Sequence, residues 1–277
     1  MLTLMYITNR PEIAKIAEGS GVQRIFIDME YIGKDVRQGG MDTVQNHHTI
    51  EDVRAVKTVL TTAKIMARCN PIHSATAEYG SSQEEVNSVI EAGADILMLP
   101  YFKTASEVKK FIQIVGGRAK VLPLVETPEA VNCIDEILAL DGVEEIFVGL
   151  NDLSLGYGMK FMFQLLADGT IDKLCAKFKE KGISYGFGGI ASLGKGALPS
   201  ENVIAEHYRL GSTCAILSRS FCNTSLMSDI KEIQSVFDKG LKEIRAWEDK
   251  CQSGRVDFME NKKEVKHIVG EIIKGIN

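Results

Sequence analysis

Two acidic residues stand just after apolar runs of the kind that forms buried strands. Residues 121–125 (VLPLV) lead into Glu126, and residues 145–150 (EIFVGL) lead into Asn151 and Asp152. One helical segment separates the two runs, and parallel strands joined in this way end at the same edge of a sheet. Two carboxylates above neighbouring strands are hard oxygen ligands for Mg²⁺ or Mn²⁺ that leave positions open for a substrate. Each acid could instead only cap the following helix, but an acid on both strands favours the metal pair.

Other positions at predicted strand ends carry groups suited to an anionic ligand. Arg68 follows the apolar run 65–67, and its guanidinium could bind a carboxylate or an enolate through two parallel hydrogen bonds. The alternative role of Arg68 is a structural ion pair with Asp28 or Glu30, and the two roles can coexist. Gly188 belongs to a glycine-rich run whose backbone amides could approach a phosphate or carboxylate, although glycines also relieve crowding at strand ends.

Two adjacent histidines, His47 and His48, are suited to proton transfer. They directly precede a predicted helix that begins at Thr49, and Asp52 three positions later makes a variant of the capping box. The partial positive charge of a helix N-terminus disfavours imidazolium, so we expect a neutral ring that is able to accept a proton. The alternative is that both histidines are ordinary polar loop residues beside a cap.

Two other classes of site lack their signatures in this chain. No lysine ends a predicted strand, and we do not expect loop lysines such as Lys34 to be desolvated, which disfavours a Schiff-base aldolase. The six cysteines are scattered and include no C-x-x-C pair. This pattern indicates buried thiols in a reducing compartment rather than disulfides or a zinc site.

Length and charge limit the class of protein. The chain of 277 residues is long enough to form one large domain. Its formal net charge of −5 and its aromatic content of 7% give no support to nucleic-acid binding. The N-terminus lacks the basic region of a signal peptide, and no apolar stretch reaches membrane-spanning length. We therefore expect a cytoplasmic protein that binds neither nucleic acid nor membrane.

Strand-like and helix-like segments alternate along the whole chain. Most of the strand-like runs are almost continuously apolar, as expected for strands that are buried on both faces. The predicted strands are 2–8, 24–29, 63–68, 95–99, 120–125, 145–150, 184–188 and 214–218. The predicted helices are 10–19, 50–62, 82–92, 104–115, 127–139, 162–181, 200–209 and 227–249. Eight such units predict an α/β fold, a closed (β/α)8 TIM barrel, with an open doubly wound sheet as the alternative.

Two segments do not fit this repeat. The polar stretch 31–49 follows the second predicted strand, and a loop of that length in a barrel is typically functional. The residues after Gly254 predict an additional amphipathic helix, so we divide the chain into a barrel domain, 1–254, and a helical extension, 255–277. The extension could clamp its own barrel or pack on a neighbouring subunit. We favour the neighbouring subunit and hence a homo-oligomer.

Taken together, these residues resemble the HpcH/HpaI aldolase and citrate lyase β-subunit superfamily, whose members are phosphoenolpyruvate/pyruvate-type barrels. The resemblance covers about 7–221 and is carried by the segments 27–30 (IDME), 67–68 (AR), 93–100 (GADILMLP), 124–130 (LVETPEA) and 148–154 (VGLNDLS). It implies that Glu126 and Asp152 bind Mg²⁺ or another divalent ion and that Arg68 stabilises a pyruvate enolate. The implied reaction is the reversible carbon–carbon cleavage of a β-hydroxy acid or its CoA thioester.

The chain departs from this family where the proton is handled. Tyr31 occupies the position of the histidine that directly follows the acid of the D-x-E-H motif in class II aldolases. The acidic partner of that histidine falls at Glu91. We therefore expect an outlying subgroup in which the loop 33–48 rebuilds the substrate end of the site. In such a subgroup His47, His48 or Tyr31 would move the proton.

The predicted function is that of a metal-dependent carbon–carbon lyase or aldolase that acts through a pyruvate-like enolate on a small hydroxy-oxo acid. Glu126 and Asp152 would hold Mg²⁺ or Mn²⁺. The side chains and amides expected to bind the 2-oxo acid or hydroxy acid belong to Glu30, Arg68, Asn151, Asp152 and Gly188. Two alternatives stay open: a catalytically inactive barrel that binds a small acid as a scaffold or regulatory subunit, and a CoA-thioester lyase or hydrolase on the same fold.

Overall fold

The computed structural model describes residues 1–34, 46–77 and 79–276, which form a closed barrel of parallel strands. The strands are β1 (Thr3–Ile7), β2 (Arg24–Asp28), β3 (Lys64–Arg68), β4 (Ile96–Leu99), β5 (Lys120–Val125), β6 (Glu145–Val148), β7 (Ser184–Ile190) and β8 (Cys214–Leu217). Each strand pairs with the next one along the chain, and β8 pairs with β1. This closure confirms the predicted (β/α)8 barrel, because an open sheet would leave β1 and β8 unpaired with each other.

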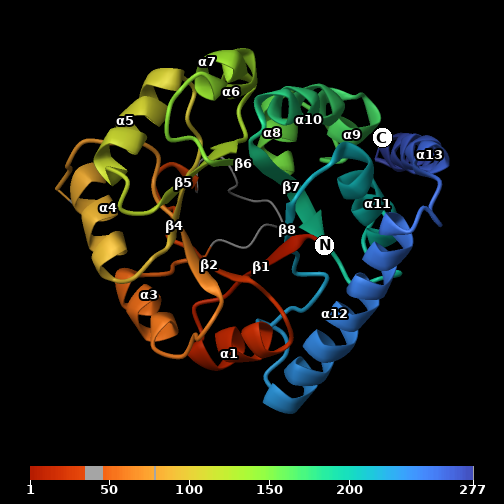
Figure 1. The fold of residues 1–277 in the computed structure, drawn as a ribbon, viewed down its shortest axis with the longest axis horizontal. Helices are drawn as coiled ribbons and strands as arrows, with labels where there is room; N and C mark the ends of the chain where they lie inside the picture. Colours follow the sequence, from red (N-terminus) through yellow and green to blue (C-terminus); the bar gives the residue numbers. More distant parts are fainter. Residues whose placement is uncertain (35–45, 78, 277) are drawn as a thin grey trace.

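A ring of helices surrounds the strands (Figure 1). The helices are α1 (Pro11–Gly19), α3 (Ile50–Lys57), α4 (Ser82–Glu91), α5 (Ala105–Val115), α6 (Pro128–Asn132), α7 (Ile134–Leu138), α8 (Leu150–Gly156), α9 (Gln164–Ala167), α10 (Thr170–Lys181), α11 (Ser200–Leu210), α12 (Ile230–Gln252) and α13 (Phe258–Gly275). The predicted helix 127–139 is divided at Cys133, and Gly169, with a φ of 85°, separates α9 from α10. The predicted strand 145–150 ends at Val148, because the chain turns into α8 two residues later.

Buried apolar side chains form two layers, as the continuous apolar strands predicted. Side chains that point into the barrel fill its centre, and those that point outward pack against the helices. The inner layer consists of Met5, Phe26, Met66, Ile96, Met98, Leu122, Leu124, Phe147 and Cys214. The barrel is therefore a packed core and not a pore.

The C-terminal helix α13 packs against α11 and α9 of its own chain (Figure 1). Val265 and Val269 are buried in this contact. Asn261 receives a hydrogen bond from Asn202 at 2.9 Å and donates one to Glu206 at 2.9 Å, so polar groups also join the two helices. The expectation that this face would pack on a neighbouring subunit is therefore wrong for its most buried residues, because α11 already covers them.

One charged cluster closes the barrel at the end where the strands begin. Glu145, the first residue of β6, accepts two hydrogen bonds from Arg24 at 2.8 and 2.9 Å. Lys120 lies 2.8 Å from the same carboxylate, and the Cys214 thiol donates to it at 3.1 Å. Although burial opposes ionisation, Arg24 and then Lys120 outweigh it and lower the pKa of Glu145 to about 2. This end of the barrel is a satisfied, buried ion-pair network.

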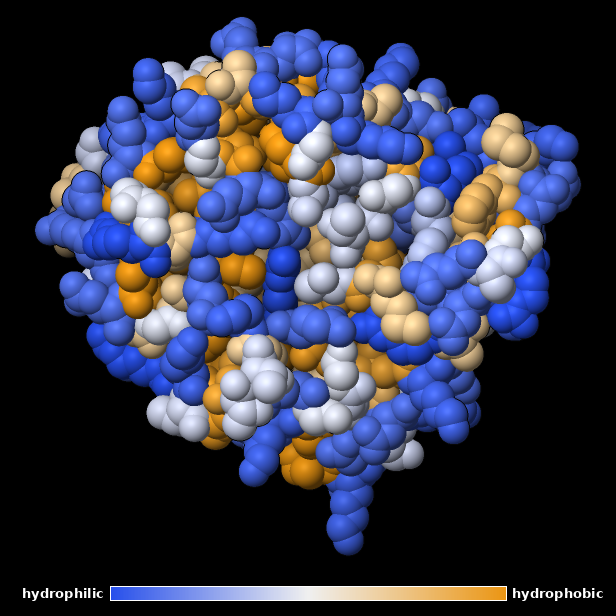
Figure 2. All heavy atoms as spheres, in the orientation of Figure 1, coloured by the Kyte–Doolittle hydropathy of each residue, from blue (hydrophilic) through white to orange (hydrophobic). Residues whose placement is uncertain are grey.

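Figure 2 shows mostly hydrophilic residues on the face viewed in Figure 1, with hydrophobic residues visible in small patches between them. Among the described residues, no helix is long and apolar enough to span a bilayer.

Candidate active site at the open end of the barrel

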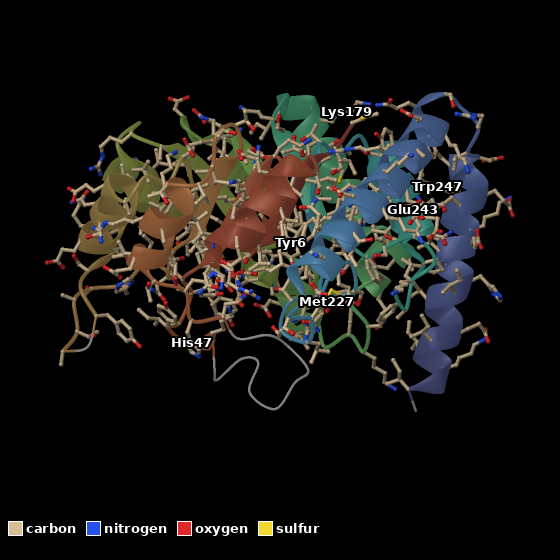
Figure 3. The ribbon with its side chains drawn as sticks, turned by 90° about the horizontal axis from the view of Figure 1, so that it is seen from below. Tyr6, His47, Lys179, Met227, Glu243 and Trp247 are labelled. Atoms are coloured by element: carbon tan, nitrogen blue, oxygen red, sulfur yellow. The ribbon has the colours of Figure 1, made fainter. Side chains whose placement is uncertain are left out.

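The polar residues predicted from the strand ends gather at one end of the barrel, called here the open end. Figure 3 shows His47 and Met227 at this lower edge of the molecule, while Lys179, which lies before the start of β7, is at the opposite edge. Asp28 and Arg68 are the last residues of β2 and β3 and are adjacent in the strand register. The parallel topology thus places all strand ends on one side, as predicted.

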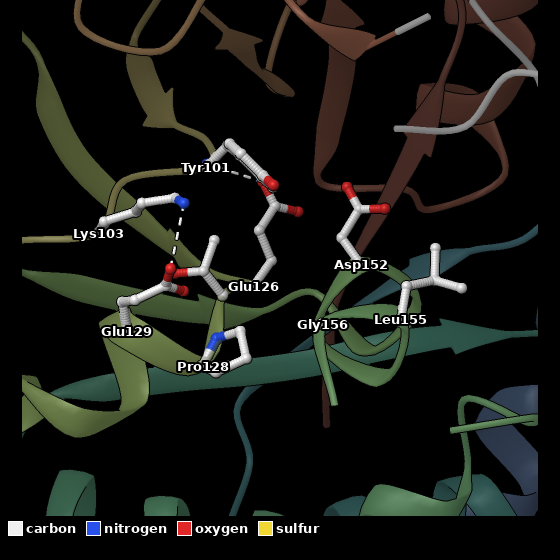
Figure 4. A pocket seen from close by; sticks show the side chains of 9 residues that line it. Tyr101, Lys103, Glu126, Pro128, Glu129, Asp152, Leu155 and Gly156 are labelled. Atoms are coloured by element: carbon white, nitrogen blue, oxygen red, sulfur yellow. Dashed lines mark hydrogen bonds and ion pairs between the residues drawn. The ribbon is translucent and has the colours of Figure 1, made fainter. Parts of the chain in front are cut away.

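Glu126 and Asp152 are buried side by side at this end. Glu126 directly follows β5, whereas Asp152 lies in the first turn of α8 and not at the end of a strand. Figure 4 shows both carboxylates facing the same space, a cavity of about 480 Å³ that both residues line. A Cβ on Gly149 would lie 2.8 Å from Glu126 Oε2, so only glycine leaves room for this carboxylate.

The backbone of Tyr101 also holds Glu126. Its N–H donates to Glu126 Oε1 at 2.8 Å, and Tyr101 has a φ of 47°, in the left-handed region that non-glycine residues rarely adopt. Such strain is typically kept where it serves a site. No sequence pattern indicated this residue, because its role depends on backbone conformation and not on its side-chain type.

Glu126 is crowded by other acids at the open end. Burial raises the pKa of Glu126 above its ordinary value of 4.5, and the nearby carboxylates of Glu30 and Asp152 raise it further, against the opposing effect of Arg68. Within the described parts of the chain, no three His, Cys, Asp or Glu side chains group as a metal site by themselves. A pair of buried carboxylates, one of them crowded by further acids, nevertheless fits a hard divalent cation whose other ligands are water and substrate oxygens.

Arg68 makes the predicted structural ion pair and also borders the cavities at the open end. Its Nε and Nη2 each donate to a carboxylate oxygen of Asp28 at 2.8 Å, and Nη1 lies 3.3 Å from Glu30 Oε2. The structural ion pair is therefore present. Arg68 also lines two cavities, one of about 210 Å³ shared with Glu126 and one of about 680 Å³ shared with His48. Its guanidinium is thus held by protein carboxylates while it borders the space open to a ligand.

Lys34 is buried, contrary to the expectation for a loop lysine. Its side chain is 3% exposed, and its Nζ lies 2.6 Å from Asp28 Oδ2 and 3.9 Å from Glu30 Oε2. The loop turns inward here because two buried carboxylates supply the charge partner that an ammonium needs. Because protein carboxylates engage its amine, Lys34 is poorly placed as a Schiff-base nucleophile, and the Schiff-base route stays disfavoured for a different reason.

The structure separates the two adjacent histidines. His48 is buried and lines the cavity of about 680 Å³ together with Asp28 and Arg68, whereas His47 is exposed and stacks on Tyr31 with ring centroids 5.7 Å apart. The predicted capping box is confirmed, because Thr49 and Asp52 exchange side-chain and backbone hydrogen bonds at the start of α3. This rigid cap fixes His48 at the edge of the cavity.

A buried network holds the backbone of Tyr31. Asn70 Oδ1 accepts from the N–H groups of Tyr31 and Ile32 at 2.8 and 2.9 Å, and Glu85 Oε1 in turn accepts from Asn70 N and Nδ2 at 3.0 and 2.9 Å. Glu91, where the acidic partner was expected, is exposed at the end of α4. The assignment to Glu91 is wrong, because the helix carries Glu85, and not Glu91, towards the strand ends.

The remaining predicted residues surround the same space. Asn151 lines the cavities of about 210 and 680 Å³, and Gly188 lines the smaller one, where its φ of 53° and a Cβ position only 2.7 Å from Leu150 require glycine. Glu30 is completely buried against Arg68 and Lys34. Glu30 therefore orients Arg68. The predicted loop residues 35–45 lie outside the described residues.

In barrel enzymes the active site lies at this end of the strands, and buried acids there can hold a catalytic metal ion. The family model for HpcH/HpaI aldolase/citrate lyase matches residues 2–162, so the chain belongs to this family. A 4-hydroxy-2-oxovalerate aldolase from Novosphingobium aromaticivorans is 24% identical over 177 residues. That match covers 54% of this chain and 60% of the relative.

Solved structures support the fold. An HpcH/HpaI aldolase from Desulfitobacterium hafniense DCB-2 superposes with a TM-score of 0.59 and 16% identity, covering 88% of this chain and 93% of that one. An HpcH/HpaI aldolase/citrate lyase family protein from Burkholderia cenocepacia J2315 superposes with a TM-score of 0.61 and 15% identity, covering 88% of this chain and 94% of that one. At such identities the likeness concerns the barrel alone.

Proposed function

We propose that this chain is a divalent-metal-dependent carbon–carbon lyase that cleaves or forms a small hydroxy-oxo acid through a pyruvate-like enolate. The observation that carries the proposal is the pair of buried carboxylates, Glu126 and Asp152, which line an open cavity together with Arg68. Membership of an aldolase and lyase family, and a relative named as a 4-hydroxy-2-oxovalerate aldolase, support the same reaction class.

Each residue has a role that follows from its position. Glu126 and Asp152 would hold Mg²⁺ or Mn²⁺, which supplies a Lewis acid for the 2-oxo acid group of the substrate. Arg68 presents a fixed guanidinium to the negative charge that develops on the substrate, and its ion pair with Asp28 prevents it from swinging away. Asn151 and Gly188 border the same cavity and would orient the ligand.

Tyr31 is poorly suited to take the proton. Burial raises the pKa of its phenol to about 12, and nearby acids, led by Asp28, act in the same direction. A base works best when its pKa lies near the working pH. Of the other two residues predicted to handle the proton, His48 lines the cavity and His47 is exposed outside it.

A metal-supplemented screen tests this function. Purified protein, treated with chelator and then given Mg²⁺ or Mn²⁺, is incubated with pyruvate or oxaloacetate and a panel of aldehydes, and products are followed by mass spectrometry. A second arm replaces the aldehydes with acyl-CoA thioesters. We expect metal-dependent formation of a hydroxy-oxo acid. Binding of Mn²⁺ and pyruvate without turnover in either arm would instead indicate a catalytically inactive small-acid-binding barrel.

The matched control is Glu129→Gln. Glu129 lines the same cavity as Glu126, but it is half exposed and pairs with Lys103 at its rim (Figure 4). We expect Glu126→Gln to abolish metal-dependent turnover and Glu129→Gln to retain most of it. Equal activity of both variants would refute the assignment of the metal to Glu126.

A further inference from the structure

We propose that His48 is a fixed hydrogen-bond donor to a substrate oxyanion and not the base of the reaction. The proposal rests on the proposed function, because it assigns one residue of that same site. It replaces the expectation, drawn from the sequence, that a neutral ring at this position would accept a proton.

The hydrogen bond between Asp28 and His48 determines where the ring carries its proton. The backbone N–H of Asp28 donates to His48 Nδ1 at 3.0 Å, and both residues are buried. A backbone N–H can only donate, so Nδ1 must be the unprotonated acceptor. The neutral ring therefore carries its single hydrogen on Nε2.

The surroundings keep this arrangement rigid. Asp28 ends β2, so its backbone N–H is fixed by the barrel, and His48 directly precedes the capped start of α3. Arg68, Lys34 and Asn46 all donate to the Asp28 side chain, which leaves little freedom for this strand end. Moving Nδ1 away from the Asp28 amide would leave a buried donor unsatisfied, which is unfavourable.

Burial favours the neutral ring of His48 and outweighs the carboxylates that face it. Burial is the largest influence and lowers its pKa, and Lys34 and His47 act in the same direction. Asp28 and Asp52 oppose them without reversing the direction. The positive end of α3 adds to the penalty on imidazolium. His48 is thus a neutral donor in the range where the enzyme would work.

This assignment has a chemical consequence. His48 and Arg68 line one cavity, and both are hydrogen-bond donors, so together they suit an oxygen that becomes negatively charged. A neutral imidazole can polarise a carbonyl in this way without giving up its proton. His48 then gains and loses no proton during the reaction, and the proton released by the substrate goes to another group.

The tautomer can be observed directly, without any substrate. Protein labelled with ¹⁵N at histidine, with His48→Asn to assign the signal, is followed by NMR across roughly pH 6–8, where an unperturbed histidine would titrate. We expect His48 to show an unprotonated Nδ1 and a protonated Nε2 throughout. A protonated Nδ1, or titration to imidazolium within this range, would overturn the proposal.

Two substitutions separate donation from proton transfer. His48→Asn keeps an acceptor near Nδ1 but loses the distant N–H, whereas His48→Gln places an amide N–H near the position of Nε2. The readout is the affinity of the Mn²⁺-loaded protein for oxalate, a planar anion that mimics the enolate, measured by calorimetry. His267→Asn, an exposed histidine of α13, is the control.

We expect His48→Asn to weaken oxalate binding about tenfold or more, His48→Gln to stay within a few-fold of the wild type, and His267→Asn to be unchanged. Equal losses in the Asn and Gln variants, or no loss in either, would overturn the donor role. If the wild type loaded with Mn²⁺ binds no oxalate at all, the proposed function itself fails, which is a different outcome.

Discussion

The barrel holds one buried ionic cluster at each end, and the two clusters are balanced differently. Where the strands begin, Glu145 is surrounded by Arg24 and Lys120, and its pKa is lowered to about 2. Where the strands end, the described residues include four buried carboxylates, Asp28, Glu30, Glu126 and Asp152, with the cations Arg68 and Lys34. There burial and neighbouring acids raise the pKa of Glu126.

This difference in charge balance distinguishes a cluster that stabilises the fold from one that suits a bound ligand. A buried carboxylate that is paired with two cations helps to hold the strands in register. Removing one partner leaves the other charges buried without a counter-charge, which strongly lowers the free energy of unfolding. A buried carboxylate crowded by other acids is unfavourable for the folded chain alone. Such a group persists where an added cation or ligand completes the site.

The largest expected effect comes from removing the charge at the open end. Glu126→Gln should lower metal-dependent turnover by roughly 10³-fold, because metal stabilisation of the developing charge contributes several kcal/mol. It should weaken Mn²⁺ binding at least about tenfold in calorimetry. The metal-free variant should be as stable as the wild type or more stable, because a crowded charge is gone. A metal isotherm identical to that of the wild type would show that Glu126 is not a ligand.

The matching substitution at the other end should have the reverse profile. Glu145→Gln should lower the free energy of unfolding by roughly 3 kcal/mol, because Arg24 and Lys120 lose their buried counter-charge. Mn²⁺ binding by the folded variant should be unchanged. Denaturant titration and calorimetry measure the two quantities. Loss of metal binding without loss of stability would mean that the two ends are not independent.

Arg68→Lys tests the bidentate geometry at the open end. Lysine keeps the charge but cannot make the two parallel hydrogen bonds to Asp28. We expect pyruvate affinity or turnover to fall roughly tenfold to a hundredfold. Arg54→Gln, an exposed residue of α3, is the control. Wild-type pyruvate binding by Arg68→Lys would restrict Arg68 to a structural role.

The smallest expected effect is that pH changes the stability contributions of Glu126 and Glu145 in opposite directions. The folded pKa of Glu126 lies above 4.5, so its favourable contribution is complete below that pH and is lost as the pH rises through the raised value. The folded pKa of Glu145 is about 2, so its contribution is present above 4.5 and is lost as the pH falls towards 2. Each contribution should amount to about 1–3 kcal/mol.

Thermal unfolding across this pH range is measured for the metal-free wild type, Glu126→Gln and Glu145→Gln. The difference in stability between the wild type and each variant gives the contribution of that residue. We expect the difference for Glu126→Gln to grow as the pH rises and that for Glu145→Gln to shrink as the pH falls. Added Mn²⁺ should stabilise the wild type more at higher pH, because binding requires the carboxylates. Parallel curves for all three proteins would contradict the contrast between the ends.

The sequence by itself determined the barrel and picked out the two acids of the candidate metal site. Eight apolar runs separated by helical patterns predict strands buried on both faces, and burial in this form depends only on local residue types. Glu126 and Asp152 were found in the same way, because the parallel connection places successive strand ends together. The position of Asp152 inside α8 was missed, since the end of an apolar run does not mark where a helix begins.

Only the tertiary structure decided how the charged and polar groups are paired. Lys34 is buried because its ammonium pairs with Asp28, and Glu85, not Glu91, lies near the strand ends. Helix α13 packs on its own barrel. The protonation of His48 depends on a hydrogen bond to a residue twenty positions away. Such contacts depend on distances and directions between separate elements, which residue types and their spacing along the chain do not specify.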